Sequence, residues 1–259
     1  MPARLNELGQ PIGAAVPGWT ARARPPRSPM AGRYARVEPL APLRHADDLY
    51  AANAAEETTP YAANAADRDG RMWTYMGYGP FADLESYRAH LERQAASADP
   101  LFFAILDRAD GCAKGIASYL RLDPANGVIE VGHIALSPGL QRTRAATEAM
   151  HLMMRRAFDE LGYRRYEWKC DDLNAPSRRA AERLGFRYEG TFRQAMVYKG
   201  RNRDTAWYAV LDAEWPTLRA AFEAWLDPAN FDADGRQRRS LGELRALARP
   251  STADEPPPS

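Results

Sequence analysis

The stretch SPGLQRTRAATE, residues 137–148, decides the fold of this chain. An apolar, strand-like run (VIEVGHIAL, 128–136) leads directly into it, and a helical pattern follows. Ala146, Met150, Met153, Met154, Ala157 and Leu161 recur at helical spacing, and Gly162 follows as a C-cap should. The sequence therefore predicts a strand, a short loop and a long helix over 144–161.

The start of this helix is a candidate anion site. A first helical turn has free backbone N–H groups and the positive end of the helix dipole. Ala145 and Ala146 are small enough to let a phosphate approach the backbone, and Arg142 and Arg144 add positive charge. The alternative interpretation is an ordinary strand-to-helix turn with solvated arginines.

Strands and helices alternate on both sides of this junction. We expect strands at 34–40, 101–107, 115–123, 128–136, 165–170, 191–198 and 205–211. We expect helices at 43–55, 83–96, 144–161, 176–184 and 215–225. The polar stretch around Asn202 is expected to form the last hairpin loop. A helix that joins two neighbouring strands is a right-handed crossover, so the class is mixed α/β, with a largely antiparallel central sheet flanked by helices.

A second group of polar residues follows the strand at 165–170. Asn174-Ala175-Pro176-Ser177 opens the next helix, and Leu184-Gly185-Phe186 and Glu189-Gly190 come after it. The crossover is short, so Asn174 is expected near the helix that starts at 144. Asn174 and Ser177 also suit an ordinary helix start, and on local grounds alone that interpretation would usually be right.

Composition restricts the function. The chain has 259 residues and a formal net charge of +1, without the basic excess of a nucleic-acid-binding protein. Cys112 and Cys170 are far apart and four histidines form no ligand pair, so no metal site is predicted. No secretion signal and no membrane-spanning run is seen, so a cytoplasmic protein is expected.

The ends of the chain differ from its centre. We expect an extended N-terminal arm over 1–32, an α/β domain over 33–226, an extension over 227–249 and a disordered tail over 250–259. Ile12, Val16 and Trp19 give the arm apolar side chains that it could bury on the domain.

Taken together, the two motifs resemble the GNAT acetyltransferases. Residues Gln141 to Ala146 are similar to their Q/R-x-x-G-x-G/A signature, and the N-x-x-S, LGF and EG segments resemble the Rim-type branch, which acetylates ribosomal-protein N-termini. IEVGHI (129–134) is similar to a strand of that branch. The likeness covers about 34–215 and implies the GNAT fold and acetyl-CoA as co-substrate, with no metal.

The resemblance also implies roles for single residues. Cofactor contacts fall on Ile134, Ala135, Leu136, Gln141, Arg142, Thr143, Arg144, Ala145, Ala146, Asn174 and Ser177. Ser177 would meet the departing sulfur, and Asn174 would hold the pantetheine arm or the amine. Tyr75, Tyr78 and His133 are candidates for the acceptor pocket, whereas Trp73 and Phe81 are expected in the core. Arg203 and Asp204 could also contact an acceptor, although charged turn residues are usually solvated.

Two positions depart from the family pattern. Arg144 replaces the first loop glycine, which would hinder phosphate binding if that position needed a positive φ. Met196 stands where some Rim-type enzymes carry a glutamate base. Glu130 is then the first candidate for the base and His133 the second. A missing base favours a low-pKa amine such as an α-amine, with a pKa of about 7.7–8.0.

The sequence predicts direct transfer of the acetyl group to a primary amine, because no cysteine or serine has a partner that would activate it. The acceptor could be a protein or peptide N-terminus, a free amino acid or another small amine; an aminoglycoside fits less well. The main alternative is a non-catalytic acyl-CoA-binding sensor, and an RNA- or ribosome-associated protein is a further one. The oligomeric state is not predicted.

Overall fold

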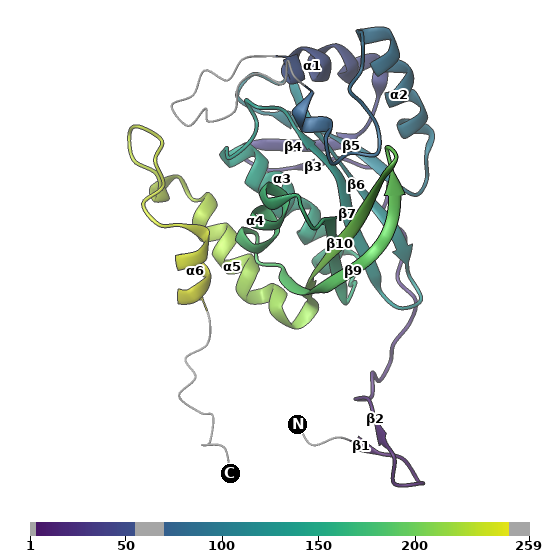
Figure 1. The fold of residues 1–259 in the computed structure, drawn as a ribbon. Helices are drawn as coiled ribbons and strands as arrows, with labels where there is room; N and C mark the ends of the chain where they lie inside the picture. Colours follow the sequence, from purple (N-terminus) through teal and green to yellow (C-terminus); the bar gives the residue numbers. More distant parts are fainter. Residues whose placement is uncertain (1–3, 55–69, 249–259) are drawn as a thin grey trace.

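The computed structural model describes residues 4–54 and 70–248. Its main sheet has eight strands in the order β3-β4-β5-β6-β7-β8-β10-β9, and a separate two-stranded ribbon, β1-β2, precedes it (Figure 1). The strands are β1 Arg4–Leu5, β2 Pro11–Ile12, β3 Met30–Ala31, β4 Ala35–Pro39, β5 Leu101–Asp107, β6 Ala113–Asp123, β7 Val128–Leu136, β8 Arg165–Asp171, β9 Arg187–Tyr198 and β10 Arg201–Leu211. All neighbouring strands are antiparallel except β7 and β8. The predicted fold class is confirmed.

Helices cover both faces of the sheet, which has a separate apolar core on each side. The helices are α1 Pro42–Ala54, α2 Leu84–Ala96, α3 Arg144–Arg155, α4 Ala175–Arg183, α5 Trp215–Leu226 and α6 Leu241–Leu247. α1 and α2 bury residues such as Leu49 and Leu91 on one face. α3 and α5 bury Met153 and Phe222 on the other.

The strands β7 and β8 pair over only four residues each. Their parallel register runs from Val128 opposite Arg165 to Val131 opposite Trp168. A bulge follows in β7, where His133 has a φ of 50° and the pairing with β6 shifts register. A bulge bends its strand, and the second half of β7 stays on β6 instead of following β8. The sheet therefore opens between β7 and β8.

A buried carboxylate joins α3 to the start of the sheet. Glu148 accepts hydrogen bonds from the backbone N–H groups of Arg33 (2.8 Å), Tyr34 (2.6 Å) and Ala35 (2.7 Å). A Cβ on Gly32 would overlap this carboxylate, so the turn before β4 needs glycine there. Glu148 thus fixes the β3–β4 turn to α3.

The N-terminal arm contacts the domain only in its second half. Trp19 Nε1 donates to the Ala125 carbonyl (2.7 Å), and Arg156 donates to the carbonyls of Ser28 (2.7 Å) and Pro29 (3.0 Å). Ile12 and Val16 are 40% and 45% exposed, so the expectation that the arm could bury these two side chains on the domain is wrong. Figure 1 shows the β1-β2 ribbon standing away from the sheet.

The C-terminal extension packs on α5. Trp225 Nε1 donates to Gln237 Oε1 (2.8 Å), Leu241 of α6 is buried, and Arg245 donates to the Glu182 carbonyl at the end of α4. The tail predicted over 250–259 lies outside the described residues.

Most predicted elements are present, and three differ. The helix predicted over 144–161 is α-helical to Arg155 and continues as a π-helical turn, Arg156–Glu160. β9 begins four residues earlier than predicted. Asn202 lies inside β10, opposite Val197, and the hairpin turns instead at Lys199 and Gly200, whose φ values are 48° and 69°. A two-residue hairpin turn of this kind requires positive φ at both positions.

Candidate active site

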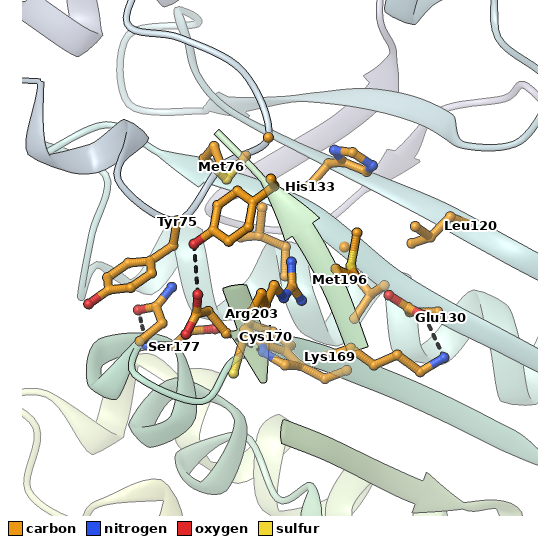
Figure 2. Close-up of a pocket in the computed structure, with 18 of the residues that line it drawn as sticks. Tyr75, Met76, Leu120, Glu130, His133, Lys169, Cys170, Ser177, Met196 and Arg203 are labelled. Carbon is orange, nitrogen blue, oxygen red and sulfur yellow. Dashed lines mark hydrogen bonds and ion pairs between the residues drawn. The ribbon is translucent and has the colours of Figure 1, made fainter. Parts of the chain in front are cut away.

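A cavity of about 220 Å³ lies where β7 and β8 separate. Its wall combines the end of β8, the bulge of β7, the start of α4, the β9–β10 hairpin and the loop before α2 (Figure 2). Its lining includes Tyr75, Met76, Leu120, Arg121, Glu130, His133, Ile134, Trp168, Lys169, Cys170, Asp171, Asn174, Ser177, Met196, Tyr198 and Arg203. The end of β8 runs directly into α4, and Leu120 and Arg121 of β6 complete the wall, so segments from most of the domain meet at one opening of the sheet.

The second half of β7 forms one side of this opening. Ala135 and Leu136 pair with β6 on their other edge, opposite Ile116 and Gly115, so the edge that faces β8 has no strand partner. Gln141 Nε2 donates to the Leu136 carbonyl (3.0 Å) and so fixes the strand end. An extended molecule with amide groups could add to this edge as a further strand does.

The predicted phosphate loop leads into α3. Thr143 is the N-cap, and its hydroxyl accepts from the Ala146 N–H (3.1 Å). Among the described residues, the N–H groups of Arg142, Arg144 and Ala145 have no acceptor. Three free donors at the positive end of a twelve-residue helix are the feature that an anion site needs, and the predicted phosphate contact stays a prediction.

Arg144 does not need a glycine's conformation, because it is the first residue of α3. The positive φ of the loop falls on Arg142, at 61°. The Arg144 guanidinium lies over the rings of Tyr34 (5.0 Å) and Phe231 (4.7 Å), so it also joins the C-terminal extension to the helix start. The replaced glycine therefore leaves the backbone of the loop intact.

Asn174 and Ser177 lie together at the start of α4. Asn174 Oδ1 accepts from the Ser177 N–H (3.1 Å), so Asn174 is the N-cap of α4. Its Nδ2 has no acceptor among the described residues. Ser177 Oγ accepts from Trp168 Nε1 (3.0 Å), which leaves the hydroxyl proton for another acceptor. The end of α4 contacts the first turn of α3, since Arg183 donates to Thr147 Oγ1 (3.2 Å). Asn174 lies at the other end of α4, so its expected position near α3 stays a prediction.

The neighbouring thiol is a poor nucleophile. Cys170 is buried beside Ser177, and burial raises the pKa of its thiol. A thiol must lose its proton to attack a thioester. The geometry therefore agrees with direct transfer to the acceptor.

Glu130 belongs to a row of alternating charges, which we call the charge ladder: Arg121, Glu130, Lys169, Glu167, Arg165 and Glu189. Glu130 Oε2 accepts from Arg121 (2.9 Å) and Lys169 (2.8 Å), and Lys169 also bonds Glu167 Oε2 (2.7 Å). Arg165 continues the row with bonds to Glu167 (2.6 Å) and Glu189 (2.9 Å). One oxygen of Glu130 is thus committed to two cations, and a proton could reach only Oε1.

His133 occupies the bulge of β7 and lines the cavity. Its ring stacks on Tyr78 (5.8 Å between centroids, 9° between planes). Burial, aided by the charges of Arg121 and Arg203, lowers the pKa of His133 below the usual 6.5. The imidazole is therefore neutral at pH 7 and can accept a proton.

The two tyrosines named from the sequence lie differently. Tyr75 lines the cavity, and its hydroxyl donates to the Leu173 carbonyl (3.1 Å). Tyr78 lies behind the wall, among Trp73, Phe81 and His90, at ring distances of 4.3 to 6.5 Å. Trp73 is buried as expected.

Sequence reasoning missed one pair in the cavity. Asp171 is buried at the end of β8 and accepts from the Tyr198 hydroxyl (2.7 Å) and the Leu173 N–H (2.9 Å). Burial and the bond to Asp171 raise the pKa of Tyr198 to about 12. The doublet Asp171-Asp172 just before Asn174 was the available signal, but its partner Tyr198 is 27 residues away in the chain.

The open sheet, the anion site at α3 and the polar start of α4 define an acyl-coenzyme A transferase. Residues 38–187 match the family model described as an acetyltransferase (GNAT) domain. The chain belongs to the GNAT family and is an acetyl-CoA-dependent N-acetyltransferase.

Solved structures and curated relatives agree on the family. A GCN5-related N-acetyltransferase from Brucella melitensis is 49% identical, with a TM-score of 0.84, over 90% of this chain and 100% of its own. The "Putative ribosomal N-acetyltransferase YdaF" of Bacillus subtilis (strain 168) is 27% identical over 55% of this chain and 78% of its own. The microcin C7 self-immunity acetyltransferase MccE, solved with acetyl-CoA and AMP, shares the fold at 19% identity, with a TM-score of 0.57 over 70% of this chain and 93% of its own.

Among residues 4–54 and 70–248, no helix is both long and apolar enough to cross a bilayer.

Proposed function

We propose that the enzyme moves the acetyl group of acetyl-CoA directly to a primary amine, either a small amine or a peptide N-terminus. The opening between β7 and β8 carries this proposal, because Ile134 of the unpaired strand edge, His133 and Ser177 line one cavity there, and β7 leads directly into the loop before α3. The loop residues 141–146 do not line that cavity. The free N–H groups at α3 would bind the pyrophosphate, and the unpaired edge of β7 at 134–136 would bind the pantetheine amides.

Each group around the cavity would then have its own role in the reaction. A backbone N–H of β7 would stabilise the negative charge that develops on the acetyl oxygen. The amine nitrogen forms a bond to the acetyl carbon as the bond from carbon to sulfur breaks. His133 would accept the proton that the amine loses, and the Ser177 hydroxyl would donate to the departing sulfur. Glu130 would take part only through Oε1.

Variants at the start of α4 test this assignment. Asn174→Asp keeps an oxygen for the Ser177 N–H, replaces the Nδ2 donor with a second oxygen and adds a negative charge. We expect Asn174→Asp and Ser177→Ala to lower kcat by about 10²-fold, the effect of losing one preorganised donor. Release of free thiol measures turnover, and calorimetry with CoA measures binding.

Asn126→Ala, in an exposed turn, is the matched control. CoA binding should change little in all three variants. Unchanged turnover in Asn174→Asp and Ser177→Ala would remove their roles. Tight binding of acetyl-CoA without thiol release, over peptides, amino acids and polyamines, would favour a sensor.

The pH dependence tests His133. The pKa of His133 lies below 6.5, so the imidazole is already neutral above pH 7. The pH dependence above pH 7 should then follow the loss of a proton from the acceptor amine. For an α-amine, kcat/KM should rise to a plateau above a pKa of about 7.7–8.0. His133→Gln should lower this plateau by about 10²-fold without moving the midpoint. A full plateau in His133→Gln would assign proton transfer to another group.

A further inference from the structure

Arg203 is the cation in the cavity that lacks an acidic partner. Arg121 and Lys169 are both bonded to Glu130, whereas Arg203 has no carboxylate within ion-pair distance among the described residues. Its Nε donates to Thr205 Oγ1 (3.2 Å), and its guanidinium lies 5.9 Å from the Tyr198 ring. The two terminal nitrogens therefore remain for a ligand.

Arg203 reaches the middle of the cavity from β10. Figure 2 shows it with Glu130 and Lys169 on one side and with Tyr75 and Ser177 on the other. A guanidinium presents paired N–H donors in a plane, which match the two oxygens of a carboxylate. A carboxylate on Arg203 would lie in the cavity that Ser177 also lines.

Asp171 adds a carboxylate to the same cavity. It lines the cavity at the end of β8, next to the start of α4. Each of its oxygens accepts one hydrogen bond, and a carboxylate oxygen has room for a second. An acid beside Asn174 and an unpaired guanidinium on β10 complement a molecule that carries an amine and a carboxylate together.

Hydrogen bonds also join the segments around the acceptor side of the cavity. Lys199 Nζ donates to the Trp73 carbonyl (2.8 Å) and Arg201 to the Thr74 carbonyl (2.7 Å), so the hairpin tip is joined to the loop before α2. Tyr75 joins that loop to Leu173 (3.1 Å). The cavity of about 220 Å³ that these segments border suits a molecule of a few carbon atoms.

We propose that the acceptor is a small amino acid-like molecule, a primary amine whose own carboxylate is held by Arg203. This inference rests on the proposed acetyl transfer and names its substrate class. The side walls formed by Leu120 and Met196 are apolar, so the rest of the acceptor would be neutral.

Matched pairs of acceptors test the proposal. Thiol release is measured with glycine and the L-amino acids other than cysteine, which carries its own thiol, and proline, whose amine is secondary. The same amino acids are then tested as C-terminal amides. Rates are expressed per neutral amine, because the amide lowers the pKa of the amine. For the preferred side chain, kcat/KM should be about 10- to 100-fold higher for the acid than for the amide, the strength of a charge-assisted bond.

Arg203→Gln should abolish that preference, measured as the ratio of kcat/KM for the acid to kcat/KM for the amide within the variant. The control is Arg193→Gln, which removes a charge from an exposed position of the same hairpin and should keep the preference. Amides or N-terminal peptides accepted as well as free acids by the wild-type enzyme would overturn the proposal and leave the transferase intact. A preference that survives in Arg203→Gln would also overturn it.

A binding measurement separates this inference from the proposed function. N-acetyl-amino acids, the expected products, and their amides are titrated into the CoA-bound protein, and tryptophan fluorescence is followed. The acids should bind at least 10-fold more tightly than the amides, and only when Arg203 is present. The difference in binding between acid and amide is expected even if no amine is turned over. Equal binding of acid and amide would refute the carboxylate site.

Discussion

Lys169→Met is expected to destabilise the protein by about 3 kcal/mol, the low end for one partner lost from a buried ion pair. The Lys169 side chain is 4% exposed, and its ammonium lies between Glu130 and Glu167, whose side chains are 4% and 8% exposed. Without it, two buried carboxylates face each other across β7 and β8. Arg121 still pairs with Glu130, and Arg165 still pairs with Glu167. The free energy of unfolding should therefore fall by no more than this range.

Urea denaturation followed by circular dichroism measures the change. Lys114→Met is the control, because Lys114 pairs with Asp107 and Asp110 near the surface and should lose at most about 1 kcal/mol. Combining Lys169→Met with Glu130→Gln and Glu167→Gln should recover much of the stability. If Lys169→Met unfolds at the same urea concentration as the control, the ladder does not hold the strands together.

Glu148→Ala is expected to lower the free energy of unfolding by about 3 kcal/mol or more. The substitution leaves the N–H groups of Arg33, Tyr34 and Ala35 without their acceptor and empties the space beside Gly32. Glu148→Gln should also destabilise, because its NH₂ group would face backbone donors.

Thermal unfolding by calorimetry checks this prediction. Glu160→Ala removes an exposed partner of Arg156 and should shift the melting temperature little. Glu148→Ala should in addition weaken CoA binding, since α3 carries the anion site and Glu148 fixes that helix to the β3–β4 turn. An unchanged melting temperature would mean that water replaces the carboxylate without loss.

The sequence predicted the parts of the fold that depend on local signals. Thr143 and Asn174 begin helices where the pattern indicated, because capping is decided within a few residues. The last hairpin was placed wrongly, because the polar stretch around Asn202 outweighed the Lys199-Gly200 pair, in which only glycine favours positive φ.

The site was predictable in outline and not in its contacts. Glu130, His133, Asn174 and Ser177 were named, and all four line the cavity. That Glu130 is shared by Lys169 and Arg121 depends on the register of three strands, which no local pattern reveals. The bond between Tyr198 and Asp171 likewise forms only when the β9–β10 hairpin folds over the end of β8.

The strand order has a consequence for how the enzyme is made. β3 to β7 pair with their neighbours in sequence, so this half can form as the chain leaves the ribosome. β9 follows β8 and α4 in the sequence, but its place in the sheet exists only after β10 has been synthesised and has inserted beside β8. Until residue 211 is available, β8 has one open edge, and Tyr198 and Arg203 are not yet beside the cleft. The wall that β9 and β10 add to the cleft is therefore assembled after the half of the sheet that comes first in the sequence.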